Sequence, residues 1–73
     1  LGHRRQREAG ALARLAERAM TIPQIVELNY SGLDPRLKGA AALSTFAHVE
    51  DLVARGLVAS DGALTLEAIY RRA

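Results

Sequence analysis

The chain has 73 residues, 49% of them hydrophobic, a formal net charge of +2 and no cysteine. This length predicts one small domain, and the lack of cysteine excludes disulfides and thiolate metal sites. No apolar run approaches the roughly 20 residues that cross a bilayer, so no membrane-spanning helix and no membrane partner are expected.

Positive charge gathers at the two ends of the chain. Residues 1–18 carry five arginines against two glutamates, and Arg71 and Arg72 lie near the C-terminus. Residues 19–69 carry three basic against six acidic side chains. Because the chain begins with Leu1 rather than methionine, we expect it to be a fragment of a longer protein. The absence of cysteine fits a cytoplasmic protein.

A first helix is expected over residues 2–19. Five apolar residues recur there at helical spacing and predict one buried face: Leu12, Leu15, Ala16, Ala19 and Met20. Gly10 lies inside this helix and costs about 1 kcal/mol relative to alanine.

A second helix is expected over residues 22–30. Thr21 and Gln24 have the spacing of a capping box, and Pro23 is tolerated in the first turn because its missing N–H is not needed there. The residues predicted to be buried are Ile22, Ile25 and Val26, with Leu28 as a further candidate. Ser31 and Gly32 supply the following turn.

A third helical segment, residues 34–56, is the centre of the expected fold. Asp34 suits its cap, Pro35 its first turn and Gly56 its end. Gly39 leaves open whether a short turn over residues 35–38 precedes a main helix that starts after Ala40. The apolar stripe predicted to face the core is Leu43, Phe46, Val49 and Val53.

The opposite face of the same segment offers a partner mostly alanine and little positive charge. Its members, the candidate domain-interface residues, are Ala40, Ser44, Ala47, His48, Asp51 and Arg55. This composition is more typical of a protein-packing surface than of a DNA-reading helix. His48 has two readings, a surface histidine with a local hydrogen bond or a member of the interface.

After residue 56 the pattern changes to that of a hairpin. Asp61 and Gly62 are a strong two-residue turn signal between residues 57–60 and 63–66, which places Leu57 opposite Leu66. Residues 67–73 are expected to form a short helix or a frayed tail. The predicted fold is mostly α with a small β-hairpin: a winged helix of three helices and two strands.

Catalytic signals are missing. His3 and His48 are far apart and lack an H-x-H or H-E-x-x-H companion, and neither Ser31 nor Ser44 lies in a G-x-S-x-G motif. The predictions are therefore no catalytic residue and no metal ligand in this chain.

One alternative function is a DNA-binding winged-helix transcription regulator. Arg36 and Lys38, at the start of the third helix, are its candidate phosphate contacts. Two cations are few, and the wing tip carries Asp61 rather than a basic residue. Nucleic acid binding is therefore the less favoured hypothesis.

Several short segments, in order, resemble one known family. They are Arg7-Glu8, residues 21–26 (TIPQIV), residues 33–37 (LDPRL), Ala40-Ala41, residues 44–52 (STFAHVEDL) and residues 56–58 (GLV). In this series the chain resembles the C-terminal winged-helix domain appended to metallo-β-lactamase-fold hydrolases. The likeness covers most of residues 4–60.

The resemblance implies that the chain is the C-terminal part of a larger hydrolase. Such enzymes bind one or two metal ions, usually zinc, through an H-x-H-x-D-H motif that this sequence lacks. The implied partner is the catalytic domain of the same polypeptide, on which the winged helix packs and shapes substrate access. Zinc is expected in that domain and no cofactor in this chain. Family members hydrolyse thioesters or other esters, and some cleave single-stranded RNA.

Overall fold

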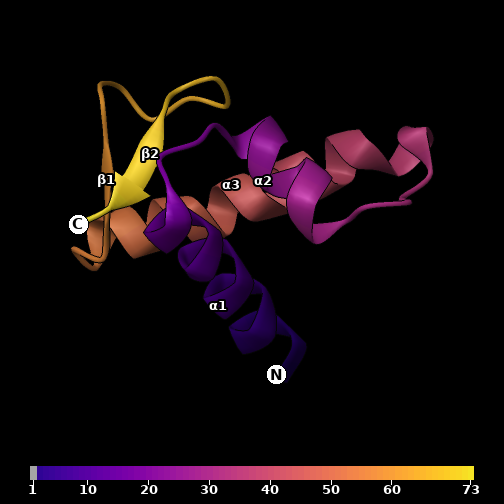
Figure 1. Cartoon of the computed structure of the whole chain (residues 1–73), viewed down its shortest axis with the longest axis horizontal. Helices are drawn as coiled ribbons and strands as arrows, with labels where there is room; N and C mark the ends of the chain where they lie inside the picture. Colours follow the sequence, from indigo (N-terminus) through magenta and orange to yellow (C-terminus); the bar gives the residue numbers. More distant parts are fainter. Residues whose placement is uncertain (1) are drawn as a thin grey trace.

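The computed structural model describes the backbone of residues 2–73 and the side chains of residues 5–73. The elements, in order, are α1 (Gly2–Glu17), α2 (Ile22–Asn29), the 3₁₀ helix η1 (Pro35–Leu37), α3 (Lys38–Ala54), β1 (Val58–Ser60) and β2 (Tyr70–Arg72). Helices α1 and α2 both pack on α3, and the two strands contact α3 and α1 (Figure 1). The predicted arrangement of three helices and a two-stranded antiparallel sheet is confirmed.

Helix α1 is shorter at its C-terminal end than predicted. It ends at Glu17, and its buried face consists of Ala11 and Leu15 with Leu12 half-buried, whereas Ala16 and Ala19 are exposed. The early end lets the chain change direction, so that Met20 exchanges two backbone hydrogen bonds of 2.9 Å with Tyr70 in β2. Met20 is therefore buried by the sheet and not as part of α1.

Helix α2 matches its prediction closely. The Thr21 hydroxyl accepts a hydrogen bond from the Gln24 amide at 3.4 Å, and Gln24 Oε1 accepts one from the Thr21 amide at 2.8 Å. This reciprocal pair is the predicted capping box, and it satisfies two amides at the helix start. Ile22, Ile25 and Val26 are buried as predicted, whereas Leu28 is exposed.

The third helical segment is split between η1 and α3. The Asp34 carboxylate accepts a hydrogen bond from the Arg36 amide at 2.9 Å and so caps η1. The change to α-helix comes at Lys38, so Gly39 lies inside α3 and does not separate two pieces. The helix is followed by Gly56, whose φ of 77° is the left-handed conformation that favours glycine.

The buried line of α3 differs from the predicted stripe. Its members are Thr45, Val49 and Leu52, while Phe46 and Val53 lie at its edge. Leu43 is 62% exposed, so its assignment to the core was wrong. The reason is that α3 packs on α1 and α2 at once, which turns the side of the helix that carries Thr45 inward.

The predicted hairpin has the wrong second strand. β1 pairs not with residues 63–66 but with β2, in the register Val58↔Arg72 and Ser60↔Tyr70. Asp61 and Gly62 therefore begin a longer loop over residues 61–69, which we call the wing loop. The strand β2 forms in the tail that was expected to be helical or frayed. The physical reason is Tyr70, a large side chain with no exposed surface whose hydroxyl donates to the Thr65 carbonyl at 2.6 Å. Burial of this residue outweighs the local turn preference.

One core joins the helices α1, α2 and α3 and the two strands. Its largest fully buried side chains are Tyr70, Met20, Ile22, Ile25, Leu52 and Val49. Among the described residues, no helix combines the length and the apolar character needed to cross a membrane.

Candidate functional site

The predicted interface residues of α3 do not share one environment. Ala40 and Ala47 are exposed, whereas Ser44, His48 and Asp51 are half-buried. Arg55, directly after α3, turns toward α1, where its Nη1 lies 3.0 Å from Glu8 Oε2. The structure thus divides the predicted face into an outward part and a part that faces α1.

The outward part is an apolar strip that we call the outer stripe. It consists of residues at helical spacing that are all exposed: Ala40, Leu43, Ala47 and Ala54. Leu37 in η1 is exposed as well. The charged side chains within the span of the stripe that reach solvent are acids, Glu50 and Asp51. A partner that binds this surface would meet apolar side chains and no cation.

The two candidate DNA contacts are each held by a carboxylate of the chain. Arg36 Nη2 lies 2.9 Å from Asp34 Oδ2, and Lys38 Nζ lies 2.6 Å from Glu27 Oε1. The hydrogen bond from the Arg36 side chain holds the pKa of the Asp34 carboxyl below its ordinary value. Binding to phosphate would have to compete with both pairs.

The wing loop also has an ion pair within the chain. Asp61, at the start of the wing loop, forms an ion pair with Arg71 of β2. This contact joins the two ends of the loop and engages one of the two C-terminal arginines. Arg72, opposite Val58 in the sheet, is exposed.

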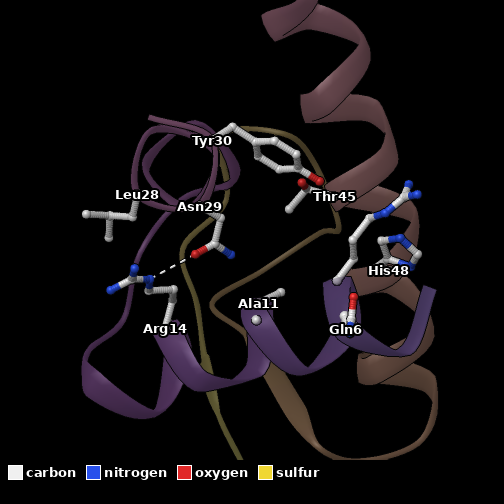
Figure 2. A pocket seen from close by; sticks show the side chains of 10 residues that line it. Gln6, Ala11, Arg14, Leu28, Asn29, Tyr30, Thr45 and His48 are labelled. Atoms are coloured by element: carbon white, nitrogen blue, oxygen red, sulfur yellow. Dashed lines mark hydrogen bonds between the residues drawn. The ribbon is translucent and has the colours of Figure 1, made fainter. Parts of the chain in front are cut away.

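A cleft of about 340 Å³ opens where α1, α2 and α3 meet (Figure 2). Two of its lining residues are cationic, Arg7 and Arg14, and we call it the arginine cleft. Its neutral polar lining residues are Gln6, Asn29, Tyr30, Thr45 and His48. Its apolar lining residues are Gly10, Ala11 and Leu28.

The arginine cleft is braced by a contact between α1 and α2. Arg14 Nε donates a hydrogen bond of 2.9 Å to Asn29 Oδ1, and Figure 2 shows this bond between α1 and Asn29. Gly10 faces the same asparagine, because a Cβ at this position would meet Asn29 Nδ2 at 3.4 Å. The glycine inside α1 thus leaves space at the floor of the cleft.

A second hollow of about 490 Å³, the Glu8 cleft, lies between α1 and the end of α3. Its polar residues are Arg5, Glu8 and Arg55, and its apolar residues are Ala9, Leu12, Leu52 and Leu57. The Glu8 side chain is only 16% exposed and is bound to Arg55, which also contacts Asp51 Oδ2 at 3.2 Å. In this cleft the acid is therefore paired with a base of the same chain.

Sequence reasoning did not single out most of the arginine cleft. Arg14, Tyr30 and Thr45 come from three different helices, and only their packing brings them together. Two signals pointed there: Gly10 in the middle of a helix, and a threonine on the side of α3 that faces the core. His48, treated as an interface candidate, is also part of this cleft.

Within the described part of the chain, no three His, Asp or Glu side chains gather as a metal site would require. His3, the other histidine, lies outside the residues whose side chains are described. The described residues thus offer no site that fits the zinc ion implied by the resemblance.

Comparison with known proteins identifies the family. A model described as a β-lactamase-associated winged-helix domain matches residues 21–70, which include α2, η1, α3 and β1 and reach the start of β2. No curated protein and no solved structure matched the chain. The family model covers well over half of the residues and the same elements that the fold contains. The chain therefore belongs to the β-lactamase-associated winged-helix domain family.

Proposed function

We propose that this chain is an accessory domain that packs on a metallo-β-lactamase-fold hydrolase domain and shapes the access of substrate to it. The hydrolase domain would belong to the same polypeptide and would hold the zinc ions. The family description, which names an associated domain, supports this proposal. The residues of this chain would contact and position the hydrolase domain, and that domain would carry out the hydrolysis.

The observation that carries the proposal is the outer stripe of α3. In a winged helix that reads DNA, the exposed side of this helix needs donors and cations for bases and phosphates. Here the same side has Ala40, Leu43 and Ala47, and the acids within the span of the stripe are Glu50 and Asp51. Exposed apolar surface of this kind marks a contact with another protein surface more often than a contact with nucleic acid.

The first test is the intact mass and zinc content of the full gene product. The proposal expects a polypeptide much larger than 73 residues that carries zinc. A metal-free product of about the length of this chain would contradict it.

The second test is a pair of matched substitutions in that gene product. Leu43→Glu places a charge in the outer stripe, and Leu64→Glu places the same charge on an exposed leucine of the wing loop. If the stripe is the docking face, Leu43→Glu weakens docking by about 2 kcal/mol or more, since the burial of one leucine is lost and a charge must be desolvated. Leu64→Glu is expected to change the thermal transition and kcat/KM much less.

The outcome that would contradict docking is equal behaviour of the two variants. Duplex DNA binding that falls steeply with salt, and that is lost on Arg36→Gln and Lys38→Gln, would instead support the transcription-regulator alternative.

A further inference from the structure

An acidic side chain, that of Glu50, lies within the outer stripe of α3. Glu50 follows Leu43 by two turns of the helix, so the two side chains point in nearly the same direction. Ala47 precedes Glu50 and Ala54 follows it along the same side of the helix, and all four residues are exposed. The carboxylate therefore belongs to the apolar surface of the stripe and does not stand apart from it.

The helix offers Glu50 no base as a partner. Such a base would stand three or four residues before or after it. Those four positions are apolar: Phe46, Ala47, Val53 and Ala54. The neighbouring acid, Asp51, has its partner in Arg55, at 3.2 Å. Among residues 5–73, ion pairs engage every acidic side chain except those of Glu50 and Glu67.

The hydroxyl of Tyr70 does not serve Glu50 either. Burial raises the pKa of the Tyr70 phenol, and the charge of Glu50 adds to the rise, so the carboxylate lies near this ring. The phenolic O–H is already engaged, because it donates to the Thr65 carbonyl at 2.6 Å. Within the described chain, Glu50 thus keeps its acceptor oxygens available to a partner.

Docking on the outer stripe would take this carboxylate out of water. A carboxylate that loses water without gaining a partner opposes association, whereas one that meets a base forms a charge-assisted hydrogen bond. A partner surface with apolar side chains alone is therefore a poor match for the stripe. A surface with one base among apolar side chains matches both the alanine and leucine side chains and the acid between them.

We propose that the surface of the hydrolase domain that docks on the outer stripe is an apolar patch with one basic side chain, which pairs with Glu50. This inference rests on the proposed docking of the stripe and adds the chemistry of the surface that the stripe recognises. Apolar contacts have little directional preference, whereas a charge pair fixes the register of two surfaces. Glu50 would therefore set the position of the two domains relative to each other.

The test uses the full gene product and measures docking by the rate of proteolysis between its two domains. When undocking is fast relative to cleavage, this rate follows the undocked fraction. Glu50→Leu removes the charge and extends the apolar stripe. If the partner supplies a base, the variant leaves that base without its acid, and we expect cleavage about tenfold faster. Slower or unchanged cleavage would show a partner surface without such a base and would overturn the proposal.

Glu67→Leu is the matched control. Glu67 is the other exposed acid without an ion pair in the described chain, and it lies in the wing loop. Its replacement is expected to change the cleavage rate by no more than about twofold, as is usual for an exposed position. Equal acceleration by the two variants would assign the effect to net charge and would overturn the pairing of Glu50.

Leu43→Glu and Leu64→Glu, measured in the same assay, separate this inference from docking itself. If Leu43→Glu accelerates cleavage more than Leu64→Glu does, but Glu50→Leu does not accelerate it, docking on the stripe stands and the base opposite Glu50 is refuted. If neither Leu43→Glu nor Glu50→Leu accelerates cleavage, the docking face is wrong and the inference falls with it.

Discussion

The two clefts beside α1 differ in the contacts of two neighbouring residues, Glu8 and Arg7. Glu8, in one cleft, is mostly buried and bound to Arg55 across the helix pair. Arg7, in the other, has no such partner among the described residues. Because adjacent residues of an α-helix point about 100° apart, this single step along α1 sends one side chain to each cleft. Glu8 thus links α1 to the end of α3, and Arg7 makes no such link among residues 5–73.

The apolar side chains that line the two clefts differ in their exposure to solvent. Leu52 and Leu12 close the Glu8 cleft with core side chains, and Leu52 belongs to the buried line of α3. Leu28, in the arginine cleft, is 39% exposed. Large core side chains thus close the Glu8 cleft, whereas the arginine cleft has the partly exposed Leu28 beside the buried Ala11.

The largest expected effect is that of shortening the floor of the Glu8 cleft. Leu52→Ala is expected to lower the free energy of unfolding by about 2–5 kcal/mol, because it leaves a cavity in the core. Leu28→Ala, the matched change in the arginine cleft, is expected to cost well under half of that because its side chain is already partly solvated. Chemical denaturation of both variants measures the difference, and equal costs would break the comparison.

An intermediate effect is expected for Tyr70, which lines neither cleft. Burial raises the pKa of the Tyr70 phenol, and the Glu50 carboxylate adds to the rise. Above about pH 10 the unfolded chain releases the phenolic proton before the folded chain does, so stability falls as the pH rises further. Removal of the hydroxyl in Tyr70→Phe should cost about 0.5–1.5 kcal/mol at neutral pH and should flatten this alkaline loss.

The measurement for Tyr70 is unfolding by denaturant between pH 7 and pH 11. Tyr30→Phe, a matched change in the arginine cleft, leaves Tyr70 in place and is expected to keep the alkaline loss. If Tyr70→Phe loses stability at high pH as steeply as the unmodified chain, the assignment to Tyr70 is wrong.

The smallest effect is expected for the ion pair of the Glu8 cleft. Glu8→Gln removes its charge but leaves Arg55 in contact with Asp51, so the loss should be below about 1 kcal/mol and should shrink at high salt. Glu67→Gln, on an exposed residue of the wing loop, is the control for the change in net charge. A loss that is equal in the two variants would show that Glu8 has no special role in this cleft.

Local signals in the sequence predicted the helices well. The capping box of Thr21 and Gln24, the cap at Asp34 and the end at Gly56 each depend on residues within a few positions of one another. For such short-range features the sequence contains almost all the relevant interactions. The outward position of Ala40 and Ala47 also followed from helical periodicity alone.

The wing and the arginine cleft were decided by tertiary structure. A local turn signal at Asp61-Gly62 competed with the burial of Tyr70, and the long-range backbone pairing of Tyr70 with Met20 prevailed. The cleft likewise needs Arg14, Asn29 and Thr45 from three helices to meet. The sequence by itself determined how α2 begins and where α3 ends, because the capping box and Gly56 act over a few neighbouring residues. Only the packed structure decided which strand joins the sheet and which charged side chains form ion pairs, because both depend on contacts between distant residues.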